Sequence, residues 1–73
     1  MGKRALRRER RARRAAAVEE LIALRAGMDA AYSVFNHTAD PELLEASILE
    51  IRALQSRYGH ALRNLMDLFP EGQ

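Results

Sequence analysis

The chain has 73 residues, 48% of them hydrophobic and 30% charged, with a formal net charge of +2 and no cysteine. This length limits it to one small domain that buries about 60% of its unfolded surface, so a lone monomer has little stability. The composition excludes a disulfide framework, a thiolate metal site and a disordered tail. No apolar run approaches the roughly 18 residues that a membrane span needs.

The charge is divided unevenly along the chain. Residues 3–14 hold eight basic side chains against one acid, Glu9, for a net charge of +7, whereas the remainder holds four arginines against nine acids, or −5. A basic arm on an acidic body indicates a polyanion or an acidic partner near the arm. The residues that we expect to contact a polyanion are Lys3, Arg4, Arg7, Arg8, Arg10, Arg11 and Arg14.

Apolar side chains spaced by three and four predict a first helix over residues 15–36. The side chains expected to pack on this helix are Ala17, Leu21, Leu24, Met28, Ala31 and Phe35. Upstream the same spacing falls on arginines, so the packing face fades near residue 15. The alanines and arginines of residues 1–16 nevertheless allow the helix to continue as a basic arm.

Asp40 and Pro41 mark the start of a second helix. The Asp40 carboxylate can accept from the free amides of the first turn, and the fixed φ of Pro41 suits the first helical position. Helical spacing then predicts a helix over residues 41–69, followed by a tail at residues 70–73. Its expected packing residues are Leu44, Ile48, Ile51, Leu54, Tyr58, Leu62, Leu65 and Phe69.

The short connection between these helices predicts an all-α antiparallel hairpin over residues 17–69. The numbers of facing residues should then sum to about 77, which places Glu20 opposite Arg57. Two helices cannot enclose a core, so apolar strips should remain exposed. Their expected members are Val18, Ile22, Tyr32, Leu49, Leu54 and Ala61. A homodimer that forms an antiparallel four-helix bundle is the simplest way to cover them.

Sequence signals for an enzyme are weak. There is no glycine-rich phosphate loop, nucleophile elbow or His-Glu-x-x-His run, so we expect no catalytic residues, cofactor, metal or small-molecule substrate. His37 and His60 lie 23 positions apart and cannot share a metal ion within one hairpin. Gly27 and Gly59 each cost about 1 kcal/mol inside a helix relative to alanine. They mark either close helix contacts or tolerated exposed positions.

One segment has a recognisable pattern. A helix ending in Phe35 is followed by the Asp40-Pro41 helix start and by the stretch Ala53-Leu54-Gln55-Ser56-Arg57-Tyr58. This pattern resembles the YaaL-like family of small bacterial proteins, a domain of unknown function, over roughly residues 18–66. The resemblance implies a small cytoplasmic helical protein without assigned activity, and it supplies no catalytic residues.

The arm leaves several interpretations open. Arginine suits bidentate contacts with phosphate, so residues 3–14 could bind RNA, DNA or the ribosome. A solvated terminus without a ligand, an acidic protein or lipid are the alternatives, although a single Leu6 among alanines gives little apolar face for a membrane surface. The sequence therefore predicts a non-enzymatic interaction module that self-associates through the hairpin. The alternative is a purely structural or regulatory protein–protein module.

Overall fold

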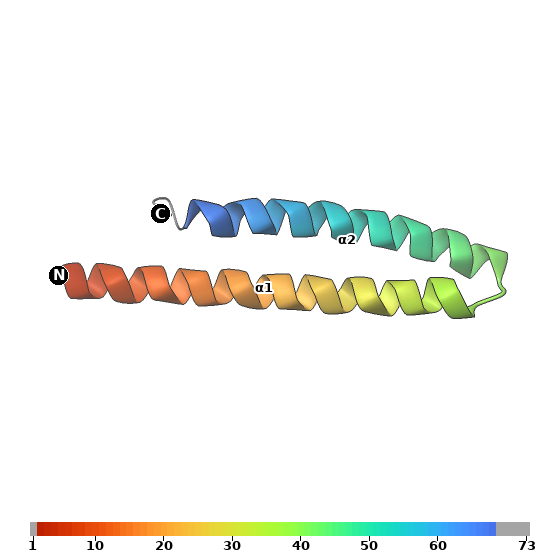
Figure 1. Ribbon diagram of the computed structural model, residues 1–73, viewed down its shortest axis with the longest axis horizontal. Helices are drawn as coiled ribbons and strands as arrows, with labels where there is room; N and C mark the ends of the chain where they lie inside the picture. The colour runs from red at the N-terminus through yellow and green to blue at the C-terminus, as the bar shows by residue number, and fades with distance from the viewer. Residues whose placement is uncertain (1, 69–73) are drawn as a thin grey trace.

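The computed structural model describes residues 2–68, which form the two helices α1 (Lys3–His37) and α2 (Pro41–Asp67). The helices run antiparallel side by side, and α1 extends beyond the C-terminal end of α2 (Figure 1). The predicted all-α hairpin is confirmed. The molecule measures 58 × 17 × 15 Å, and its Cα radius of gyration is 17.0 Å. A compact domain of this length would have a radius of about 11 Å.

Helix α1 runs for 35 residues without a break. The first helix, expected over residues 15–36, therefore merges with the arm into one element. The residues from Lys3 to Ala16 include no glycine or proline and are mostly arginine and alanine, which favour the helix without any packing partner. The arm and the hairpin thus differ in charge and in packing on either side of residue 16, whereas the helical backbone continues unchanged through this point.

Side chains cap both sides of the turn between the helices. The Asp40 Oδ1 accepts from the backbone N–H of Glu42 at 3.0 Å, and Pro41 opens α2, so the predicted helix start is confirmed. The Thr38 Oγ1 accepts from the backbone N–H of Asp40 at 3.1 Å. At the end of α1, the His37 Nδ1–H donates to the Ser33 carbonyl oxygen at 2.8 Å. These bonds fix the direction in which the chain reverses.

Loss of the α2 cap has a defined expected effect. Asp40→Ala should lower the free energy of unfolding by about 1 kcal/mol, because the first-turn amides lose their acceptor. Asp40→Asn keeps a capping oxygen and should change it little. Urea denaturation followed by circular dichroism measures both variants, and an unchanged midpoint for Asp40→Ala would show that the cap contributes nothing.

The contact between the helices follows a heptad spacing. Apart from the two helical glycines, the buried and half-buried residues of α1 are Arg14, Ala17, Leu21, Leu24, Met28 and Ala31. Those of α2 and its cap are Leu44, Ser47, Ile51, Leu54, Tyr58, Ala61, Leu65 and Leu68. Steps of three and four average 3.5 residues, which keeps a single seam on the partner helix along its whole length. The predicted packing at ten sites is confirmed: Ala17, Leu21, Leu24, Met28, Ala31, Leu44, Ile51, Leu54, Tyr58 and Leu65.

Ile48 and Leu62, predicted to be core or interface residues, do not lie in the contact between α1 and α2. Ile48 is 38% exposed and Leu62 41% exposed, whereas their neighbours Ser47 and Ala61 are buried at 5% and 3%. A small side chain on the seam lets the helix backbones approach closely, and the larger neighbour then lies beside the contact. The Ser47 Oγ–H donates to the Leu44 carbonyl oxygen at 2.9 Å, which satisfies the buried hydroxyl.

The ends of the predicted packing series also differ from expectation. Phe35 is 37% exposed because it lies at the turn, where α2 has only begun. Helix α2 ends at Asp67, two residues earlier than expected. Phe69 and the tail at residues 70–73 lie outside the described residues.

The pairing register is shifted from the predicted sum of 77. A Cβ atom on Gly27 would lie 3.4 Å from the Leu54 Cδ1, and the Gln55 Nε2–H donates to the Tyr32 hydroxyl at 3.3 Å, so these pairs sum to 81 and 87. Helical side chains lean toward the N-terminus of their own helix. In an antiparallel pair, a side chain therefore contacts a residue with a higher number than the residue level with its own Cα atom. The numbers of two residues in contact then sum to more than 77.

The same geometry resolves two other expectations. Gly27 lies at a close helix contact, whereas a Cβ on Gly59 would meet only the flexible Arg63 side chain at 3.7 Å. Within the described residues, Glu20 and Arg57, which were expected to face each other, form no ion pair. An ion pair instead joins Arg25 and Asp29 along α1, with the Nε and Oδ1 atoms 3.7 Å apart and both side chains largely exposed.

Candidate functional site

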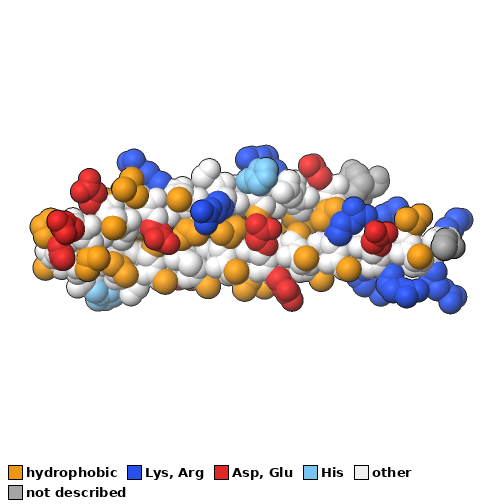
Figure 2. Space-filling view, turned by 180° about the vertical axis from the view of Figure 1, so that it is seen from behind, with side chains coloured by type: hydrophobic (Ala, Val, Ile, Leu, Met, Phe, Trp, Pro, Cys, Tyr) orange, Lys and Arg blue, Asp and Glu red, His pale blue; other side chains and the backbone are white. Residues whose placement is uncertain are grey.

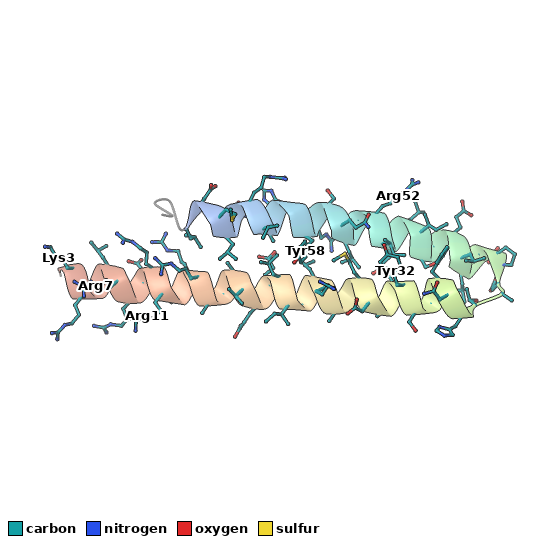
Figure 3. The ribbon with its side chains drawn as sticks, in the orientation of Figure 1. Lys3, Arg7, Arg11, Tyr32, Arg52 and Tyr58 are labelled. Carbon is teal, nitrogen blue, oxygen red and sulfur yellow. The ribbon has the colours of Figure 1, made fainter. Side chains whose placement is uncertain are left out.

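The basic arm is the part of α1 that extends beyond α2. Figure 3 shows Lys3, Arg7 and Arg11 on this stretch. Every residue from 2 to 13 is exposed, and Arg14, where the seam with α2 begins, is half-buried. A helix is formed here before any ligand binds, so its cations are already held on a rigid element.

The heptad seam continues into the arm, but its chemistry changes. Upstream of the apolar positions, the same steps of three and four fall on Arg14, Arg10, Arg7 and Lys3. The row that buries apolar side chains against α2 thus becomes a row of cations where α2 ends. The sequence signal for this change is that arginines occupy the positions where the packing pattern would otherwise place apolar side chains.

Five of the seven predicted arm residues lie around two shallow hollows on this row. One hollow, of about 320 Å³, is lined by Arg7, Arg10, Arg11 and Arg14. The other, of about 210 Å³, is lined by Lys3, Leu6, Arg7 and Arg10. Each guanidinium has five N–H donors and no acceptor, so neighbouring arginines can hold the oxygens of one phosphate between them.

The remaining two predicted residues lie further around the helix. At 100° per residue, Arg4 and Arg8 are about a quarter to a third of a turn away from Arg14. Arg8 lines a separate hollow with Ala5, Glu9 and Ala12. The Glu9 carboxylate lowers the positive potential in that hollow.

The charges form a gradient along the long axis. Residues 26–51, which surround the turn, hold five acids and no lysine or arginine. Figure 2 shows Lys and Arg side chains gathered at the arm end, whereas acidic side chains lie along the whole hairpin, several of them at the turn end. A molecule with opposite charges at its two ends orients an approaching charged partner.

A second candidate surface is apolar and lies along one flank of the hairpin. Residues spaced by seven lie on the same side of a helix. Val18 and Tyr32 are spaced in this way on α1, as are Ile48, Gln55 and Leu62 on α2. The hydrogen bond between Tyr32 and Gln55 shows that both series lie on the same flank. We define the apolar face as six large side chains that are 38–65% exposed: Val18, Ile22, Tyr32, Ile48, Leu62 and Met66.

The predicted apolar strips are therefore partly confirmed. Val18, Ile22 and Tyr32 are exposed as expected, and Leu49 is 60% exposed. Leu54 was expected both on the seam and in a strip, and it lies on the seam. Ala61 was expected to be exposed, and this is wrong, because it also lies on the seam. Ile48 and Leu62, expected in the core, take their place on the surface.

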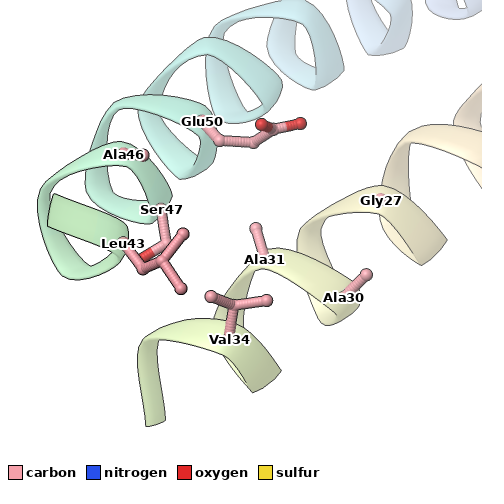
Figure 4. A pocket seen from close by; sticks show the side chains of 8 residues that line it. All are labelled: Gly27, Ala30, Ala31, Val34, Leu43, Ala46, Ser47 and Glu50. Carbon is pink, nitrogen blue, oxygen red and sulfur yellow. The ribbon is translucent and has the colours of Figure 1, made fainter. Parts of the chain in front are cut away.

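The opposite flank carries a shallow groove near the turn (Figure 4). It encloses about 360 Å³ and is lined by Gly27, Ala30, Ala31, Val34, Leu43, Ala46, Ser47 and Glu50. Small side chains create the hollow, since larger ones would fill the space between the helices. The lining supplies one carboxylate and one hydroxyl, so it offers no pair of groups suited to acid–base or nucleophilic catalysis.

Residues 2–68 contain no group of three or more His, Asp or Glu side chains that could hold a metal ion. None of the helices in this part of the chain is long and apolar enough to cross a bilayer. Comparison of the chain with models of known protein families, with curated proteins and with solved structures finds no match. The fold and its surfaces define a helical hairpin with a cationic arm, and function is inferred from that geometry.

Proposed function

We propose that the protein is a non-enzymatic interaction module that self-associates through its hairpin and binds nucleic acid through its arm. The cationic continuation of the heptad seam is the observation that carries this proposal. Along this seam Lys3, Arg7 and Arg10 are exposed, and Arg14 is half-buried where the contact with α2 begins. Like charges at this density are stabilised by an external polyanion.

Duplex RNA or DNA fits the arm better than other polyanions do. A helix is about 10–12 Å wide with its side chains, and the DNA major groove is about 12 Å wide. Guanidinium groups pair with phosphate oxygens in a bidentate manner. The arm has no aromatic residue on which single-stranded bases could stack. Binding should thus depend on the phosphate backbone and not on base sequence.

Fluorescence anisotropy with short labelled duplexes tests the nucleic-acid part of the proposal. If four or five cations reach phosphates, the logarithm of the affinity should fall against the logarithm of salt concentration with a slope of roughly −3 to −4.5. Two duplexes of unrelated sequence should bind equally. Absence of binding at 50 mM salt would favour a solvated arm without a ligand.

The amount of exposed surface supports self-association. The chain exposes 5882 Å², whereas a compact monomer of 8.3 kDa exposes about 4,600 Å². This excess is larger than the roughly 800 Å² that each partner buries in a stable complex. Sedimentation equilibrium at tens of micromolar should show a dimer, and a well-folded monomer would contradict the proposal.

The apolar face also favours a second candidate function. Six exposed apolar side chains on one flank suit a protein partner as well as a second copy. The protein would then be a purely structural or regulatory module with a solvated arm. The resemblance to YaaL-like proteins and a cytoplasmic location are compatible with both functions, because neither depends on a membrane. Binding of nucleic acid in the anisotropy experiment separates the two.

A further inference from the structure

We infer that two copies, related by a two-fold axis, pair through the apolar face with their long axes antiparallel. In this head-to-tail orientation, the acidic turn of each copy lies beside the inner arginines of the other copy's arm. This inference rests on the self-association proposed above and specifies its surface and direction. It also divides the arm into cations that contact the second copy and cations that remain for a polyanion.

The apolar face is the surface that fits a second copy. It extends from the level of Val18 and Leu62 to that of Tyr32 and Ile48, along nearly the whole length over which the helices overlap. The groove on the opposite flank is confined to the region of the turn, and half of its lining residues are alanine or glycine. In a four-helix bundle, an apolar stripe beside the seam is the part of each helix that contacts the second helix pair.

The spacing of the apolar face allows a two-fold axis at its middle. Val18 and Tyr32 each lie seven residues from Arg25 in α1, and Ile48 and Leu62 each lie seven residues from Gln55 in α2. An axis perpendicular to the helices at this level brings the Val18 end of one copy onto the Tyr32 end of the other. Each copy thereby covers the other's apolar side chains in two matching layers, as an isologous dimer requires.

Charge selects the head-to-tail orientation over the parallel one. Parallel copies would place two arms of +7 side by side, and two acidic turns side by side at the other end. The head-to-tail arrangement places the inner arginines of each arm level with Asp40, Glu42 and Glu45 of the other copy and removes both repulsions. At the axis Arg25 meets its own copy, and the Asp29 carboxylate paired with each Arg25 offsets that like charge. Groups brought within a Debye length of about 8–10 Å interact with little screening, so the orientation is set by these two ends.

The charged ends meet at the same level along the bundle. With the axis at Arg25 and Gln55, Arg11 lies about 21 Å from it, and Glu45 of the other copy lies about 15 Å from it on the same side. The axis stacks α1 on α1 and α2 on α2, so these two residues attract each other as parts of two charged ends and form no direct ion pair.

The pairing has a consequence for the arm. Arg10, Arg11 and Arg14 lie beside the acids of the second copy, whereas Lys3, Arg4, Arg7 and Arg8 project beyond its turn. The outer four are then the cations available to phosphates. Because Arg7 lies about 27 Å from the axis, the two outer clusters are about 54 Å apart. One dimer therefore presents two polyanion sites at opposite ends and can bridge two duplexes.

Pulsed electron paramagnetic resonance on the full chain measures the orientation directly. The sequence has no cysteine, so Ala5→Cys carries a single spin label on an exposed arm position. The head-to-tail dimer predicts a distance of about 60 Å between labels, since Ala5 lies 20 residues from the axis. A dimer with labels less than 30 Å apart would be parallel and would overturn this inference alone. A monomer in sedimentation would overturn the proposed self-association as well.

Discussion

Ile51→Asp should abolish both the helical fold and self-association. Ile51 is only 8% exposed and lies in the central cluster with Ala31 and Leu54, against which Leu24 and Met28 pack. The substitution removes a buried side chain worth about 2–5 kcal/mol and adds a carboxylate that has no buried partner, which costs several kcal/mol more. A domain this small has little more stability than that to lose.

Far-ultraviolet circular dichroism at 25 °C measures this effect, and sedimentation measures the loss of the dimer. Leu49→Asp is the matched control, because Leu49 is two positions away but 60% exposed, and its variant should remain helical. A helical Ile51→Asp protein with a normal unfolding midpoint would show that the seam between α1 and α2 does not stabilise the fold.

Replacing three outer arginines with glutamine should remove most of the affinity for nucleic acid. In the variant Arg4→Gln, Arg7→Gln and Arg8→Gln, the arm loses three of its seven net charges. The salt slope should become shallower by about 2–3, at roughly 0.9 per lost phosphate contact, and the affinity at 50 mM salt should fall at least a hundredfold. Helicity should not change, since glutamine is a good helix former and these positions are exposed.

A variant with three neutralised arginines in α2 provides the matched control. Arg52, Arg57 and Arg63 are exposed, and replacing all three with glutamine removes the same charge. They lie five and six residues apart, so they do not form one stripe on the helix. Binding should remain within a few-fold of the original. If this variant lost binding and the arm variant kept it, the nucleic-acid site would lie on α2.

The sequence alone was sufficient for the secondary structure and the reversal of the chain. Asp40 and Pro41 act through neighbouring backbone groups, so the cap could be identified without knowing any distant contact. The same holds for the arm, because arginine and alanine stabilise a solvated helix by their own propensity. The arm's charge and lack of aromatic residues were likewise readable from composition.

The tertiary structure decided which of two neighbouring residues lies on the seam. Helical spacing permits a step of either three or four, so Ser47 and Ile48 were both possible, as were Ala61 and Leu62. The larger residue was predicted in each case, yet the smaller one is buried. Two helix backbones approach closely only where the side chain between them is small, as at Gly27 against Leu54. This close approach depends on both helices at once, and it moves Ile48 and Leu62 onto the apolar face.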